Sequence, residues 1–440
     1  MIKKAKKFLL LNSTAITLLV IFNMSIIEML LGIFIGKLPS IVIMWSTWLI
    51  FYLISLRKTP HLITRKDVMM FSIWVVILLF SVYRLQREQN EYMREAYNSI
   101  RYCTAFYFLG KMVSINNKED YMSLFSWSPV ICVVLFALIY STGGVAGAKE
   151  LMFGYRKDNP NMLADYSMYL GYRLLPNLVI AIFLSLNGRK WQIPLMLVMF
   201  MIVFSAGTRG PIVCALGAFT ITFLSKINLR SWKLWLSVFI FSIIAILILV
   251  NYEAILRWLL KFLKNANLST RIVTHLLDGN FTNSSGRTEL YKGAIKGINE
   301  YLFTGTGIYR DRQYLVENYN NYYPLGYKVL TSSTGSYSHS ILFDLPLQLG
   351  LFVGGTLLFL YFRMLIKVWR QMSKQSRLQD DAGLIYVILL SICLFPTFFG
   401  GSFPGNRNLY LLMGFALEQL KHKTGSRGIN SEKHTLTENS

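Results

Sequence analysis

Charged residues are scarce in this chain. Only 15% of its 440 residues are charged, against roughly 25% in an ordinary soluble domain, while 54% belong to the hydrophobic set. Acidic residues are the scarcest, with 22 Asp and Glu against 45 Lys and Arg and a formal net charge of +23. This composition argues against a soluble fold and predicts an integral membrane protein. The cations lie mostly between long apolar runs, where they orient spans and face anionic lipid head groups, so we expect no nucleic-acid binding.

The signatures of common catalytic sites are also missing. The sequence contains no P-loop, no HExxH or GxSxG motif and no Cys/His metal set. The motifs that usually indicate nucleotide hydrolysis and metal-dependent hydrolysis are therefore absent. We expect no cofactor and no metal, and any chemistry must use bond energy that the substrate already holds. The four cysteines lie inside apolar runs without paired spacing, which is typical of small core residues: Cys103, Cys132, Cys214 and Cys393.

Long apolar runs are what the sequence has in abundance. A spanning helix needs roughly 20 mostly apolar residues, and the runs predict an all-α polytopic membrane protein with about twelve transmembrane helices. We interpret the first run as a retained span and not a cleaved signal peptide, because it is long and lacks a small-residue cleavage site. The predicted spans are Phe8–Leu30, Leu38–Leu56, Val68–Tyr83, Ser99–Ser114, Tyr121–Tyr140, Met162–Leu186, Trp191–Ala206, Pro211–Ser225, Leu234–Val250, Ser340–Phe362, Gly383–Phe399 and Phe403–Leu420.

The distribution of lysine and arginine orients these spans. With the N-terminus inside, the segments on the inner side hold 24 of the 45 cations and the short outer loops hold nine, as the positive-inside rule requires. We therefore expect both termini to be cytoplasmic. This topology divides the chain into a bundle of about nine spans (1–250), a large extracytoplasmic loop (251–339), three C-terminal spans (340–420) and a polar cytoplasmic tail (421–440).

The large loop of 89 residues is too long for a simple connection and carries helical patterns. Tyr252–Asn265 places apolar residues along one stripe with cations beside them, which is typical of a helix lying in the membrane interface. Arg287–Asn299 also has helical spacing, and Gly305-Thr306-Gly307 breaks the chain after it. We therefore predict a small folded element with short helices.

Two arginines lie within or between spans. Arg173 falls about eleven residues into the sixth predicted span, near mid-depth, so it must either pair with an acid such as Asp165 or serve a functional cavity. Arg209 stands in Gly207-Thr208-Arg209-Gly210-Pro211 between two spans. It either anchors lipid head groups or binds a phosphate, which the flanking glycines would allow to approach the backbone.

The large loop holds the other candidate residues. Arg287 follows Ser285-Gly286 and opens a predicted helix, an arrangement that favours anions unless the residue is merely solvated. His339 lies where the loop re-enters the membrane, either as a general base or as an ordinary interfacial histidine. Three tyrosines could stack on sugar rings or belong to the aromatic interface belt: Tyr322, Tyr323 and Tyr337.

These pieces, in this order, resemble the bacterial O-antigen polymerases and O-antigen ligases. The resemblance covers most of the chain after Asp158 and rests on Asn159-Pro160-Asn161, Gly207-Thr208-Arg209-Gly210-Pro211, Gly286-Arg287, Gly305-Thr306-Gly307, and Ser338-His339 followed by Leu349-Gly350-Leu351. The chain departs from the family pattern at Ser340, where Asn is common, and at Asp344, where Glu is frequent.

The resemblance implies an inverting, metal-independent glycosyl transfer from a polyprenyl-pyrophosphate-linked oligosaccharide, such as an undecaprenyl pyrophosphate carrier, at the outer face of the bacterial cytoplasmic (inner) membrane. By position, Arg209 and Arg287, with Arg173, would bind pyrophosphate, and His339 would act on the acceptor hydroxyl. We expect a polymerase that builds a surface polysaccharide, O-antigen of lipopolysaccharide or capsule, with membrane lipid and possible chain-length regulator and flippase partners. A ligase using another acceptor, a flippase or transporter, and a non-catalytic scaffold stay open as alternatives.

Overall fold

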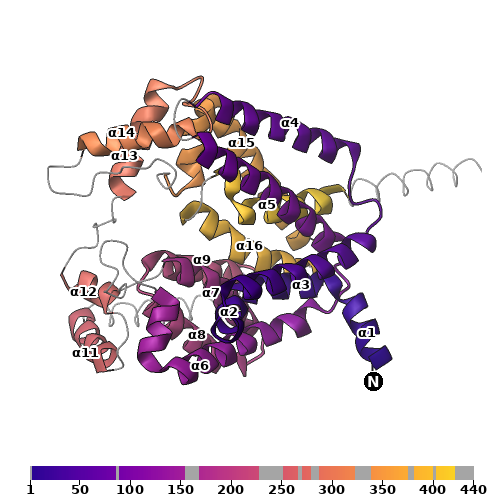
Figure 1. The fold of residues 1–440 in the computed structure, drawn as a ribbon, viewed down its shortest axis with the longest axis vertical. Helices are drawn as coiled ribbons and strands as arrows, with labels where there is room; N and C mark the ends of the chain where they lie inside the picture. The colour runs from indigo at the N-terminus through magenta and orange to yellow at the C-terminus, as the bar shows by residue number, and fades with distance from the viewer. Residues whose placement is uncertain are drawn as a thin grey trace, which may run out of the picture.

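The computed structural model describes residues 2–85, 89–153, 168–226, 251–265, 270–278, 287–322, 338–374, 381–399 and 403–421. Within these ranges every regular element is a helix and none is a strand. Figure 1 shows the N-terminus on the right of the molecule and helices α11 to α14, which belong to the predicted loop, on the left. The loop helices therefore lie on the other side of this view from the N-terminus, and the predicted orientation in the membrane stays a prediction.

The helices follow the predicted apolar runs closely. The first group is α1 (Ile2–Leu11), α2 (Ser13–Ile35), α3 (Lys37–Arg57), α4 (Arg65–Tyr83), α5 (Gln89–Ile115), α6 (Tyr121–Phe153), α7 (Met168–Leu186), α8 (Gln192–Ser205) and α9 (Arg209–Leu224). The second group is α11 (Tyr252–Asn265), α12 (Arg271–Leu277), α13 (Arg287–Glu300), α14 (Arg310–Tyr322), α15 (Ile341–Lys374) and α16 (Asp381–Phe399), followed by the short 3-10 helix η1 (Phe403–Gly405) and a last helix over residues 407–421.

The apolar helices are those of a polytopic membrane protein. Among the described residues, α2, α3, α4, α6, α15 and α16 are long and apolar enough to cross a bilayer, and α7, α8 and α9 are shorter apolar helices. The total of twelve spans stays a prediction, and the predicted span Leu234–Val250 lies outside the described residues.

The first predicted span, Phe8–Leu30, is wrong in its start because the chain breaks at Asn12. This side chain donates from Nδ2 to the Phe8 carbonyl at 3.2 Å, and its Oδ1 accepts the backbone N–H of Asp120 at 3.0 Å. Asn12 therefore ties the start of α2 to the α5–α6 connection and separates the lysine-rich α1 from the span.

The tenth predicted span, Ser340–Phe362, is not one continuous helix. Gly350 has φ 79° and ψ 159°, so α15 divides into a first segment over 341–349 and a longer second segment. The Thr306 N–H donates to the Leu347 carbonyl at 2.8 Å, and the Gly307 N–H donates to the Gln348 carbonyl at 3.0 Å. The break leaves these carbonyls open to the loop, and a Cβ on Gly305 would lie only 2.4 Å from the Gln348 oxygen. Close backbone packing thus explains two of the glycine motifs.

A buried ion network joins α4, α5 and the last helix. Lys111 is 1% exposed, and its ammonium lies 2.7 Å from Asp67 and 3.6 Å from Glu418. Lys111 lies near the C-terminal end of α5, which begins at Gln89 and not at the predicted Ser99. A buried cation needs such partners because desolvation of a lone charge is costly.

Candidate functional site

Glycines bring the start of α9 against α7. A Cβ on Gly171 would lie 2.7 Å from both Thr208 Oγ1 and Pro211 Cγ. A Cβ on Gly210 would lie 2.3 Å from the hydroxyl oxygen of Tyr172. Neither position has room for a side chain, so Gly210 of the predicted motif and Gly171 opposite it serve helix packing. The phosphate-approach interpretation of these glycines is not required to explain them.

This contact places Arg173 and Arg209 in one region. Arg209 is the first residue of α9, after a turn in which Gly207 has φ 71°. Arg173 follows Tyr172 on α7, at the level of the first turn of α9. Arg173 therefore lies level with the start of the neighbouring helix, and its depth in the bilayer stays a prediction.

Arg173 pairs with an acid that the sequence analysis missed. Its Nη1 lies 3.8 Å from Glu28 Oε2 on α2. The Arg173 side chain is 27% exposed and the Glu28 side chain is 17% exposed. Arg407, at the start of the last helix, acts electrostatically on both residues. Its guanidinium lies over the ring of Tyr102 at 5.2 Å from the centroid. Two arginines thus gather around one glutamate, which leaves an excess of positive charge.

The segment before α15 holds His339 in an unusual conformation. His339 has φ 58°, in the left-handed region that a residue with a side chain adopts at a cost. The Ser338 hydroxyl donates to Asp344 Oδ1 at 2.5 Å and lies 2.9 Å from the Ser340 carbonyl. Asp344 Oδ2 accepts the backbone N–H of Phe403 at 3.1 Å. These hydrogen bonds hold the backbone on both sides of His339.

The same carboxylate connects the segment around His339 to the segment that precedes Arg407. Asp344 binds Phe403, which lies four residues before Arg407. Phe403 is also fixed by an edge contact with Trp74, with ring centroids 5.4 Å apart. The buried Asp344 is therefore an anchor between the start of α15 and the start of the last helix, which explains why an acid suits this position.

Arg287 is the first residue of α13, and its side chain lies outside the part of the chain that can be described. The position of its backbone follows from packing. Tyr291 stacks on Phe343 at 4.8 Å, and a Cβ on Gly297 would lie 2.6 Å from Leu347. Since α13 thus runs alongside the first segment of α15 in the same direction, its N-terminal end lies toward the start of α15, and so toward His339.

The three candidate tyrosines are not tested by these contacts. Tyr322 is the last residue of α14, and nothing is described of its side chain. Tyr323 and Tyr337 lie outside the described residues. Their contact with glycan stays a prediction.

A second buried charge cluster fixes α14, and the sequence analysis did not find it. Gln348 Nε2 donates to Asp311 Oδ2 at 3.0 Å, and Arg312 forms an ion pair with Glu95 on α5. Burial raises the pKa of Asp311 and of Glu95. The positive charge of Arg312 offsets part of this rise, and both pKa values stay above their ordinary range. The sequence shows only an Asp-Arg pair in a tyrosine-rich loop, so its burial could not be inferred locally. The cluster joins the loop to α5 and to the first segment of α15.

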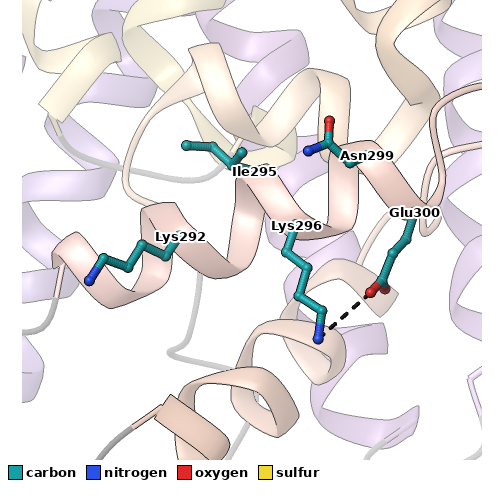
Figure 2. Close-up of a pocket in the computed structure, with 5 residues that line it drawn as sticks. All are labelled: Lys292, Ile295, Lys296, Asn299 and Glu300. Carbon is teal, nitrogen blue, oxygen red and sulfur yellow. Dashed lines mark ion pairs between the residues drawn. The ribbon is translucent and has the colours of Figure 1, made fainter.

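A shallow groove of about 460 Å³ on α13 has a different character. Its lining consists of Lys292, Ile295, Lys296, Asn299 and Glu300, which all belong to one helix (Figure 2). The Lys296 ammonium lies 3.7 Å from the Glu300 carboxylate, one turn away. This groove is a solvated helix face, and it brings no other element together.

The comparisons with known proteins agree with the expected family. Residues 194–360 match a family model described as O-Antigen ligase. The match includes Arg209, Arg287 and His339 and ends before Arg407. No curated protein matches the chain. Over residues 194–360 the resemblance to the O-antigen polymerases and ligases, which are glycosyl-transferring membrane enzymes, is therefore confirmed.

Proposed function

We propose that the protein polymerises lipid-linked oligosaccharide repeat units into a surface polysaccharide, O-antigen or capsule, at the outer face of the bacterial cytoplasmic membrane. The observation that carries this proposal is the α7–α9 contact, which brings the helix segments that carry Arg173 and Arg209 together, with Arg407 acting electrostatically on Arg173. Arg173 and Arg407 against the single acid Glu28, with Arg209 at the start of the neighbouring helix, suit a ligand with several negative charges, such as the pyrophosphate of a polyprenyl carrier.

The reaction is an exchange of one C–O bond for another. The acceptor hydroxyl oxygen attacks the anomeric carbon of the donor glycan, and the bond from that carbon to the pyrophosphate oxygen breaks with inversion. His339 takes the hydroxyl proton, and the polyprenyl pyrophosphate leaves with the bonding electrons. Arg173, Arg209 and Arg287 bind the pyrophosphate and stabilise the charge that develops on it, which is the largest electrostatic demand of the step.

The left-handed backbone at His339 supports its assignment. Strained residues persist where the surroundings fix them, and they are frequent in active sites. Here Ser338 and Asp344 supply that fixation. The tyrosines Tyr322, Tyr323 and Tyr337 are proposed to contact the glycan.

A ligase that transfers the finished glycan to another acceptor is the second candidate, because the matching family model is described as an O-Antigen ligase. The two activities share the donor and the leaving group. They differ in the acceptor, so they are distinguished by the product and not by the arginines.

The test is the length of the glycan on cells of a deletion strain complemented with wild type, Arg209→Ala, Arg287→Ala or His339→Ala. Arg257→Ala, an exposed cation on α11 paired to Glu253 within its own helix, is the matched control at equal membrane expression. A ladder that collapses to one repeat unit in the three variants supports the polymerase. Long lipid-linked chains that never reach their final acceptor would assign a ligase, and three variants that behave as the control would remove these residues from the site.

A further inference from the structure

A polar cavity lies apart from the arginines of the proposed donor site. It has a volume of about 720 Å³ and lies between the C-terminal end of α4 and residues 301–317, and Figure 1 shows α4 and α14 close together at one end of the molecule. Phe80 and Arg84 line it from α4, and Gly307, Arg310 and Glu317 line it from the loop. Unlike the groove on α13, this cavity joins two elements that are far apart in the sequence.

The charges of the cavity favour an anion. Arg84 and Arg310 stand against one acid, Glu317. Glu317 is seven residues beyond Arg310 on α14, roughly 10 Å along the helix axis, so the arginine end of the cavity is the more positive. Tyr301 adds a hydroxyl group to the lining, whereas the Tyr314 hydroxyl donates to Glu300, a second acid outside the lining, at 2.7 Å.

The cavity opens at the end of an apolar stripe on α4. Met69, Ile73, Val76, Phe80 and Tyr83 are each at least 52% exposed, and their spacing of three or four residues places them on one face. Because α4 is apolar enough to span the bilayer, this face is a surface for acyl or prenyl chains. Phe80 belongs both to the stripe and to the cavity, so an apolar tail along α4 leads to a polar head beside Arg84.

The wall of the cavity is attached to the segment that follows His339. Thr306 and Gly307 line the cavity and donate their N–H groups to the carbonyls of Leu347 and Gln348. From Ser340 to Gln348 the helix rises by roughly 12 Å. A head group bound in the cavity would therefore not touch His339, but a saccharide attached to that head group would extend toward it.

We infer that this cavity binds the phosphate head of the acceptor, a second polyprenyl-linked saccharide whose tail lies on the exposed face of α4. The inference rests on the proposed function, in which donor and acceptor both carry a polyprenyl phosphate group. It assigns the donor to Arg173 and Arg209 and the acceptor to Arg84 and Arg310, with the acceptor hydroxyl meeting the donor at His339.

The experiment counts the undecaprenyl phosphate molecules that bind to the purified full-length protein by native mass spectrometry. Wild type is expected to bind two, and the double variant Arg84→Gln/Arg310→Gln is expected to bind one, with the lost site weakened at least about tenfold because a charge-assisted contact is removed. Arg209→Ala is expected to lose the other molecule. Lys292→Gln, an exposed cation of the α13 groove (Figure 2), is the matched control and is expected to bind two.

Two molecules bound to Arg84→Gln/Arg310→Gln would overturn the inference. The one molecule that Arg84→Gln/Arg310→Gln is expected to keep shows that the double variant is folded, which separates loss of binding from loss of folding. Phosphatidylglycerol that displaces the second molecule at equal concentration would assign the cavity to ordinary anionic lipid and overturn the acceptor role. The glycan ladder of Arg209→Ala tests the proposed function, whereas the number of bound undecaprenyl phosphate molecules tests the acceptor cavity. Either proposal can therefore fail while the other holds.

Discussion

At the scale of the residue, Arg173 shows why charge alone does not define a binding group. Its guanidinium already lies 3.8 Å from Glu28, so a pyrophosphate must compete with, or add to, that pair. A guanidinium can do so because it presents several donors in a planar fork, whereas a lysine ammonium is a compact point charge.

Arg173→Lys is therefore expected to lower the polymerisation rate by roughly 10- to 100-fold, the equivalent of one charge-assisted hydrogen bond. The measurement is the rate of glycan extension in membranes that hold equal amounts of protein. Arg257→Lys, in the exposed pair with Glu253, is expected to leave the rate unchanged. A normal rate in Arg173→Lys would show that only a positive charge is needed at this position.

Asp344 offers a second test at this scale, because its carboxylate accepts hydrogen bonds on both oxygens, from Ser338 and from the Phe403 N–H. Asp344→Ala leaves these buried donors unsatisfied, and we expect a loss of about 1–3 kcal/mol for each, measured as a lower unfolding temperature in detergent. Asp344→Asn retains an acceptor and is expected to keep most of the stability and activity. A folded Asp344→Asn that is as inactive as His339→Ala would instead give the carboxylate a role in the chemistry.

At the scale of the element, the break in α15 depends on two glycines whose backbones touch. A Cβ on Gly305 would lie 2.4 Å from the Gly350 nitrogen, and a Cβ on Gly350 would lie 2.4 Å from the Phe303 carbonyl oxygen. Both also have positive φ. The loop and the two segments of α15 therefore form one packed unit, which holds the cavity wall and the start of α15 together.

Gly305→Ala is expected to destabilise the protein by roughly 2–4 kcal/mol, because overpacking adds to the strain of a positive φ. Gly188→Ala is the matched control: Gly188 has φ 86°, but a Cβ there would meet nothing within 4 Å, so it shows the strain alone. Thermal unfolding of both variants measures the difference. Equal losses would mean that the loop can move away from α15 at no cost.

The sequence predicts the features that depend on local residue patterns and does not predict those that depend on contacts between distant segments. The amphipathic stripe predicted Tyr252–Asn265, and α11 has these bounds. The break at Gly350 was not predicted, because the residues on both sides of it are mostly apolar and the cause is backbone contact with residues 303–307. The Glu28–Arg173 pair was missed for a similar reason, since it joins α2 and α7 and no local spacing indicates it. The family resemblance supplied Arg209 and His339, and only packing related them to Arg407.

At the scale of the whole molecule, the charge asymmetry of the sequence predicts that the loop helices and the N-terminus lie on opposite sides of the membrane. Figure 1 shows the N-terminus on the right and α11 to α14 on the left, and the sides of the membrane that they face stay a prediction. The four cysteines are free and buried, so a cysteine introduced at an exposed position can be labelled against a low background. Lys292 on α13 and His61 between α3 and α4 are such positions.

Lys292→Cys is expected to react with a membrane-impermeant maleimide in cells whose cytoplasmic membrane is intact and exposed to the reagent, whereas His61→Cys is expected to react only after that membrane is permeabilised. The physical reason is the excess of lysine and arginine in the inner segments, which resist translocation. Unmodified wild type gives the background labelling. The reverse pattern would place α13 and the cavity beside it in the cytoplasm, where neither the proposed donor nor the proposed acceptor would be presented.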